Sequence, residues 1–324
     1  MSPKAKKLIS IGIKAVILVL AFVFIYRRLT HNQNLSNFNH LLKNLPVINV
    51  QLVLISVFAL MLLNWFLEAL KWKFLVKTIE PISLWKAIES VFCGLTWAIF
   101  TPNRIGEFGG RVFFLSPRKR IFGVIAMAVG AWGQMVITNV LGSLAIIWFI
   151  YRFVPLDDWL FNIIAFVGIV FCLFFLIFYF NIRWLKSLIG SVGFLKRFDK
   201  FLAILSRYRR RDLLKVFSYC VLRFAVFTSQ YYLVIHLLVP ALPVFEMVMM
   251  ILILFFIQSA LPSLDLLDVG VRSMTATYFF SYITNQDIAI MAAAACIWLV
   301  NLIIPAILGS VFVLKLNFFG TNRN

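Results

Sequence analysis

The residues best able to do chemistry lie in one short stretch, from Thr101 to Arg111. This stretch carries Arg104, Glu107 and Arg111, together with three glycines, inside a sequence that is otherwise strongly apolar. Charges and broken helices are costly at membrane depth, and they are tolerated where protein buries them or where they line a wet cavity. A guanidinium matches a pair of phosphate oxygens, and a helix N-terminus also favours anions. The stretch therefore predicts an anion site.

A second polar stretch, residues 262–272, contains the same ingredients further along the chain. We expect the two stretches to meet in one polar cavity near mid-membrane. The candidate substrate-binding residues are Arg104, Glu107, Arg111, Asp268 and Arg272. The alternative is structural: the pair Arg104–Glu107, at i and i+3, would only fix the first break, and Asp268–Arg272 the second.

Prolines and glycines predict where the two stretches bend. The candidate hinge residues are Pro102, Gly106, Gly109, Gly110, Pro262 and Gly270. Other polar residues in apolar runs have ordinary expected roles. We expect Glu68 to be structural, Arg223 to snorkel towards the membrane surface, and Trp65 and Trp72 to belong to an interfacial aromatic belt.

The composition is that of an integral membrane protein. Hydrophobic residues make up 63% of the 324 residues and charged residues only 13%, about half the charge of a soluble domain. The net charge of +19 does not indicate nucleic acid binding, because the basic residues sit in short loops between apolar runs. The four cysteines are far apart and have neither metal-ligand nor disulfide spacing. We therefore expect one membrane domain over residues 1–324, with no metal and no cofactor.

Hydropathy and charge predict an all-α polytopic fold. Six runs are long enough to span a bilayer: 8–26, 50–70, 124–150, 159–180, 215–238 and 289–315. The stretches 84–115 and 246–282 are broken by proline and predict two re-entrant hairpins that enter from opposite faces. With cytoplasmic termini, this arrangement places 22 of the 31 lysines and arginines inside, in agreement with the positive-inside rule. The layout also suggests an inverted repeat.

The loop 181–215 alternates apolar residues with lysine and arginine. This pattern is typical of a basic amphipathic helix on the inner leaflet, where it would gather anionic lipids. Ordinary topology charge would give the same composition.

The motif Pro102-x-Arg104-x-Gly106-Glu107, followed by Arg111, resembles the first signature of the lysylphosphatidylglycerol synthase-type, flippase-like membrane domain. Residues 262–272 resemble its second signature, although Asp265 and Leu266 stand where glycines are expected and Ser273 replaces an acid. The resemblance covers nearly the whole chain. It implies a membrane part alone, because no aminoacyl transferase domain follows within these 324 residues.

The resemblance implies a membrane domain that moves, or helps to move, lipids or lipid-linked molecules across the bilayer. Together with the predicted anion site, we expect a flippase-like transporter of an anionic lipid or a lipid-linked intermediate in the bacterial cytoplasmic (inner) membrane. The expected partners are membrane lipids with anionic head groups, with a second copy of the chain or a membrane enzyme as further candidates. One alternative is a non-transporting partner or regulator of a lipid- or glycan-modifying enzyme. Intramembrane catalysis is a weaker alternative, because the sequence has no nucleotide loop and no catalytic triad.

Overall fold

The computed structural model describes residues 46–99, 101, 104–184, 203–260 and 265–313, and it contains no strand among them. Five helical segments within these ranges are long and apolar enough to cross a membrane. They are Val47–Val76, Pro117–Phe153, Asp158–Phe180, Arg210–Leu238 and Asp287–Val313. Each contains or overlaps one of the predicted spans. The remaining predicted span, 8–26, lies outside the described residues, as does most of the basic loop 181–215.

The long helices are α3 (Val47–Val76), α6 (Arg120–Phe153), α7 (Asp158–Phe180) and α10 (Arg210–Leu238). The last crossing segment is continuous but irregular, and it consists of α13 (Asp287–Trp298), the π-helical turn η5 (Leu299–Ile303) and α14 (Ile304–Val313). The shorter elements are α4 (Leu84–Ala98), α5 (Ile105–Val112), α11 (Val244–Ala260) and α12 (Asp265–Phe280), with 3-10 turns η2 (Pro117–Lys119) and η4 (Ala203–Arg207).

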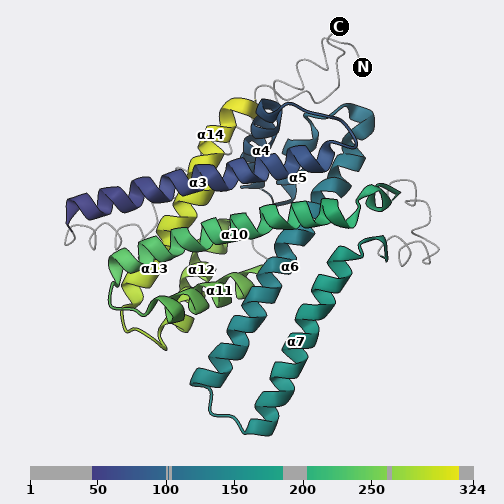
Figure 1. Cartoon of the computed structure of the whole chain (residues 1–324). Helices are drawn as coiled ribbons and strands as arrows, with labels where there is room; N and C mark the ends of the chain where they lie inside the picture. Colours follow the sequence, from purple (N-terminus) through teal and green to yellow (C-terminus); the bar gives the residue numbers. More distant parts are fainter. Residues whose placement is uncertain (1–45, 100, 102–103, 185–202, 261–264, 314–324) are drawn as a thin grey trace.

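The helices α4 and α5 form a pair whose two outer ends lie together (Figure 1). Ser83 caps the start of α4 by accepting a hydrogen bond from the Lys86 backbone N–H at 3.1 Å. Glu80, just before it, accepts a hydrogen bond from the backbone N–H of Ser116, beyond the end of α5, at 3.1 Å. Its carboxylate also lies 3.7 Å from the Lys86 ammonium and 3.9 Å from that of Lys119. The Glu80 side chain thus links the start of α4 to the residues that follow α5.

Partial burial alone would raise the pKa of the Glu80 carboxyl. The hydrogen bonds from Ser116 and the charges of the two lysines outweigh that effect and hold the pKa below its ordinary value. The carboxylate form is therefore favoured at neutral pH, which keeps the tie between the two ends charged.

The helices α11 and α12 form a second pair, and its outer ends lie at the other end of α6. Phe245, at the start of α11, packs edge-on against Trp148, with ring centroids 5.5 Å apart. Phe279, at the end of α12, packs against Phe149 at 5.4 Å. The two helix pairs therefore approach the middle of the molecule from opposite ends of α6. This is the layout expected of two opposed hairpins, and their re-entrant path through a membrane and the inverted repeat stay predictions.

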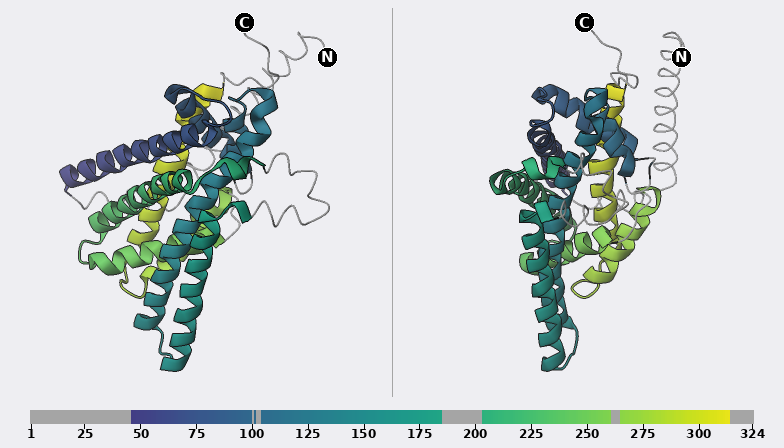
Figure 2. Two further views of the ribbon diagram at one scale, coloured as in Figure 1. Left: turned by 45° about the vertical axis from the view of Figure 1, so that its right-hand side comes forward. Right: turned by 90° about the vertical axis from the view of Figure 1, so that its right-hand side faces the viewer.

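The long helices pack around this centre. Helices α3 and α10 run side by side in Figures 1 and 2, and the Gln230 amide of α10 donates to the Val57 carbonyl of α3 at 2.9 Å. Helix α7 stands at the edge beside α6, and only two of its residues, Cys172 and Tyr179, are buried. Trp65 and Trp72 are 4% and 1% exposed, so the predicted belt position was wrong for both. Each packs in the protein core because its helix is covered by α10 and α4.

Candidate functional site

The break between α4 and α5 is held by one threonine and one unusual arginine. The Thr101 hydroxyl accepts a hydrogen bond from the Gly106 backbone N–H at 2.7 Å and lies 3.2 Å from the Trp97 carbonyl, to which it donates. Arg104, the residue before α5, has φ 57° and is left-handed. Side chains other than glycine rarely adopt this conformation, and it costs about 1–3 kcal/mol where it occurs. Such strain is concentrated at functional sites, which directs attention to Arg104.

Two glycines allow α5 to lie directly against α4. A Cβ at Gly110 would come within 2.5 Å of the Gly94 Cα, and one at Gly106 within 2.3 Å of the Trp97 carbonyl oxygen. Close packing therefore explains these two glycines without any bending. A Cβ at Gly109 would meet nothing nearer than 3.8 Å, and one at Gly270 nothing within 4 Å. The predicted hinges Pro102 and Pro262 lie outside the described residues, and a hinge role for the set stays a prediction.

A buried ion network begins at Glu68 of α3. One of its carboxylate oxygens accepts from the Arg111 guanidinium at 2.5 Å. The other lies 2.8 Å from the Lys71 ammonium and also accepts from the Arg223 guanidinium of α10. Glu68 is only 5% exposed and thus binds three cations from three helices. This connection fixes α3, α5 and α10 relative to one another.

The network continues through Glu107 of α5. One oxygen of Glu107 accepts from the Arg111 guanidinium, and the other lies 3.2 Å from the guanidinium of Arg104. The predicted Arg104–Glu107 pair therefore exists. Arg111 is 1% exposed and held between two carboxylates. Arg104 shares the Glu107 carboxylate with Arg111 and is much more open, with a side chain 35% exposed.

Two of the arginines also lie over one aromatic ring. The guanidinium carbons of Arg104 and Arg223 are 5.9 Å and 5.3 Å from the centroid of the Trp65 indole. Arg223 further donates from Nε to the Asn64 side-chain oxygen at 2.9 Å. A ring quadrupole attracts a cation at this separation. Trp65 therefore helps to hold both guanidinium groups in place, and Asn64 helps to hold that of Arg223.

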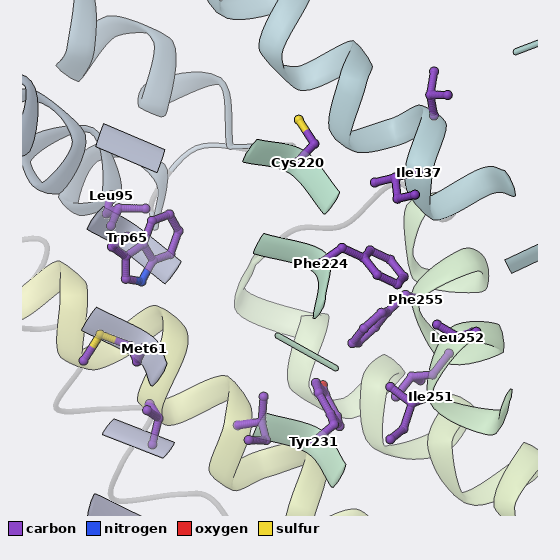
Figure 3. Close-up of a cluster of buried hydrophobic side chains, with 14 of the residues drawn as sticks. Met61, Trp65, Leu95, Ile137, Cys220, Phe224, Tyr231, Ile251, Leu252 and Phe255 are labelled. Carbon is purple, nitrogen blue, oxygen red and sulfur yellow. The ribbon is translucent and has the colours of Figure 1, made fainter. Parts of the chain in front are cut away.

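Beside the network lies a cavity of about 360 Å³. Its polar lining is Asn64, Arg104, Gln134, Thr138, Arg223, Gln258, Ser259, Arg272 and Asn301. Its apolar lining is Trp65, Phe224, Phe227, Phe255, Ile297, Trp298 and Leu302. Figure 3 shows part of this apolar side, where Phe224 and Phe255 point towards each other; their ring centroids are 5.5 Å apart. The cavity thus has a cationic, polar wall and an aromatic wall.

The cavity lies about halfway along each long helix that lines it. Asn64 is near the middle of α3, Gln134 near the middle of α6 and Arg223 near the middle of α10. Asn301 lies in the π-helical turn η5, halfway along the last crossing segment. Such turns are rare and frequent at functional sites. Helices that cross a bilayer would therefore place the cavity far from both surfaces.

The structure brings Arg104 and Arg272, from the two predicted stretches, to the lining of one cavity. Glu107 and Arg111 belong to the ion network behind it and are absent from that lining. Asp268 lies in α12, but its side chain is outside the described set. Sequence reasoning expected a structural role for Glu68 without its partners, and it missed Arg223 and Trp65 as members of this site. A charged residue inside an apolar run was the only available signal for the first two.

The chemistry of the cavity is that of an anion site. Three arginines line it, and no carboxylate does so among the side chains that the structure describes. These described residues also contain no group of three histidine, cysteine or acidic side chains that could hold a metal ion. Guanidinium groups bind phosphate and carboxylate through paired hydrogen bonds. The opposite aromatic wall suits the apolar part of the same ligand.

A model of the protein family described as "Lysylphosphatidylglycerol synthase TM region" matches residues 9–309. No curated protein and no solved structure matches the chain. The matched range includes both motif stretches and every residue of the cavity lining.

Proposed function

The chain belongs to the lysylphosphatidylglycerol synthase transmembrane-region family, and from this premise we propose that it is a flippase-like transporter of an anionic lipid or a lipid-linked intermediate. The cavity carries the proposal. It combines three arginines with an aromatic wall halfway along the long helices. A lipid head group in transit needs such a place, because a charge cannot cross the hydrocarbon region without partners.

The size of the cavity limits what it holds. A volume of about 360 Å³ is at the lower end for small-molecule sites. It suits a phosphate and its nearest substituents, whereas complete acyl or isoprenoid chains are much larger. In our proposal the head group occupies the cavity and the chains extend between helices into the bilayer.

The phosphate would bind to Arg104, Arg223 and Arg272, which line the cavity. Glu107 has a separate task. It contacts Arg104, and in our proposal it partly neutralises that guanidinium when no phosphate is bound. An unpaired buried charge is strongly destabilising. When phosphate replaces Glu107 as the partner of Arg104, the positive charge of that guanidinium would remain compensated, both with and without bound ligand.

Movement of the head group would come from the two helix pairs. The pair α4–α5 contributes Arg104 and the pair α11–α12 contributes Arg272, and the pairs approach from opposite ends of α6. We propose that they rearrange against one another and open the cavity to each leaflet in turn, as opposed broken helices do in other transporters. In this scheme Asp268 supports Arg272, and the predicted hinge residues absorb the bending.

Catalysis fits the two buried carboxylates poorly. Glu68 contacts three cations and Glu107 contacts two arginines. A carboxylate so strongly paired is a weak proton acceptor, and a general base must reach its substrate. We therefore propose transport without a covalent step and without a cofactor.

The cellular setting is part of the same proposal. We place the protein in the bacterial cytoplasmic membrane with both termini cytoplasmic, on the strength of the uneven distribution of lysine and arginine. Cysteines introduced one at a time at positions 196–211 should resist an impermeant reagent in intact cells. Labelling of those positions from outside would contradict this orientation.

The transport test uses the full-length protein in vesicles that contain a fluorescent anionic phospholipid. The fraction of label accessible to an external quencher reports lipid movement. Wild-type protein should make the inner leaflet accessible, and Arg104→Ala and Arg223→Ala should reduce the rate at least tenfold. Arg210→Ala is the matched control, because Arg210 lies on α10 in an exposed contact with Asn181. We expect it to behave like wild type.

The same experiment separates transport from the second candidate, a non-transporting partner of a membrane enzyme. Absence of lipid movement with wild-type protein, together with full complementation of a deletion strain by both cavity variants, would exclude the transport proposal. Loss of complementation by the cavity variants alone would support it.

A further inference from the structure

We infer that the cavity selects a phosphate group with two negative charges, carried by a lipid phosphomonoester or a lipid diphosphate, over a phosphodiester with one. The inference rests on the proposed function and specifies the ligand of the same site.

The first observation is the charge of the ion network. Its described members are four cations and two carboxylates, with a formal sum of +2: Lys71, Arg104, Arg111, Arg223, Glu68 and Glu107. Excess charge held away from water is costly unless a counter-charge is near. A dianionic phosphate brings the sum for these side chains to zero, whereas a phosphodiester leaves +1.

The second observation is the position of the two guanidinium groups that face the cavity. Arg104 and Arg223 both lie within 6 Å of the Trp65 ring centroid, at 5.9 Å and 5.3 Å. Two like charges at one ring repel each other, and an anion bound between them would reduce that repulsion further than the Glu107 and Glu68 contacts do. The Nε of Arg104 has no hydrogen-bond partner among the described side chains. It is thus a donor that a bound anion would satisfy.

The number of phosphate oxygens leads to the same ligand. A phosphomonoester has three terminal oxygens, and a phosphodiester has two. Arg104, Arg223 and Arg272 line the cavity, and each guanidinium presents a fork of donors. Only the monoester, or the terminal phosphate of a diphosphate, offers a separate oxygen to each fork.

The lining also argues against zwitterionic head groups. An ammonium group needs a carboxylate or a free aromatic face. No carboxylate lines the cavity among the residues described, and the Trp65 ring already has two guanidinium groups nearby. Phosphatidylcholine and phosphatidylethanolamine should therefore bind poorly.

The test measures binding to the full-length protein in a neutral detergent, with short-chain phosphatidic acid and phosphatidylmethanol as the matched probes. They differ by one methyl ester, which removes one negative charge and one terminal oxygen. At pH 8 we expect phosphatidic acid to bind at least tenfold more tightly. The second ionisation of a phosphomonoester has a pKa of about 6, so the preference should shrink at pH 5, where the second charge is lost.

Two variants locate the preference. Arg104→Gln and Arg223→Gln each remove one cation and should reduce the preference to about threefold or less. Arg210→Gln, on the exposed side of α10, should retain it. Farnesyl diphosphate should compete with phosphatidic acid for the same site. Dioleoylglycerol, which lacks phosphate, should not bind.

The outcomes are distinguishable. Equal binding of phosphatidic acid and phosphatidylmethanol at pH 8 would overturn the dianion inference and leave an anionic-lipid transporter in place. Binding of neither lipid would contradict the proposed function itself. If inorganic phosphate displaced phosphatidic acid at equal concentration, the dianion chemistry would stand and the lipid source would be rejected.

Discussion

Two groups of charged side chains, one behind the other, occupy the centre of this molecule and differ in how they are satisfied. The inner group, Glu68, Lys71 and Arg111, is almost fully buried, and both of its cations contact the Glu68 carboxylate. The cavity group, Arg104, Arg223 and Arg272, faces an open volume of about 360 Å³. Arg104 and Arg111 stand only seven residues apart, yet their side chains are 35% and 2% exposed.

The difference teaches that residue type alone does not tell whether a charged residue at membrane depth stabilises the fold or binds a ligand. Arg111 contacts carboxylates on two helices and has little capacity left for a ligand. Arg104 contacts one carboxylate among the described side chains, that of Glu107, and it has a strained backbone and a place in the cavity wall. We therefore propose that the inner group serves folding and the cavity group serves binding.

The largest expected effect comes from opening the inner group. Arg111→Gln would leave Glu68 and Glu107 without their shared cation, and breaking a buried pair from one side costs about 3–5 kcal/mol. Unfolding in mixed micelles should show this loss. Arg104→Gln is the matched comparison, because its partly exposed pair should contribute about 1 kcal/mol or less. Similar losses for both variants would erase the distinction between the groups.

The next effect concerns the close packing of α5 against α4, which positions both Arg104 and Arg111. Gly110→Ala would set a Cβ 2.5 Å from the Gly94 Cα and should cost about 1–3 kcal/mol in unfolding free energy. Gly109→Ala should be neutral or slightly stabilising, since its nearest atom would be 3.8 Å away. If instead both variants kept wild-type stability and lost lipid movement, the glycines would act as hinges rather than as packing sites.

The smallest effect concerns Glu80, a charged group at the end of the molecule. Its pKa is held below the ordinary value, so its contribution to stability is present above the unfolded pKa of about 4.3. That contribution disappears as pH falls through the lower, folded pKa. Wild type and Glu80→Gln should therefore differ slightly in unfolding midpoint at pH 7 and converge at the acid end. A difference that grew on acidification would contradict this sign.

Local sequence patterns predicted those parts of the structure that depend on neighbours in the chain. Apolar run length located five crossing segments, and proline and glycine located the break before α5. The Arg104–Glu107 contact was predicted from the i and i+3 spacing, although Arg104 stands just before the first residue of α5. The family of the chain was also predicted, from the residues of the first motif between Pro102 and Arg111.

Long-range pairing was not predictable in the same way. Glu68 meets partners 43 and 155 positions away in the sequence, at Arg111 and Arg223. Nothing near either residue signals such a contact. Trp65 was misassigned for the same reason, because an aromatic residue near the end of the predicted span 50–70 fits an interfacial belt and a buried cation contact equally well. The left-handed backbone of Arg104 and the turn η5 likewise have no simple sequence signal.

The π-helical turn η5 has a consequence for the helix that follows it. A π-helical turn contains one residue more than an α-helical turn, and one residue corresponds to a rotation of about 100° around the axis. The side chains from Ile304 onward therefore point about 100° away from the direction that they would have if α13 continued as a regular α-helix. Gly309 then faces α4, where a Cβ would overlap the Phe92 carbonyl, and the Ala306 carbonyl accepts from Thr96 at 2.9 Å. The additional residue in η5 thus determines which face of α14 packs against α4.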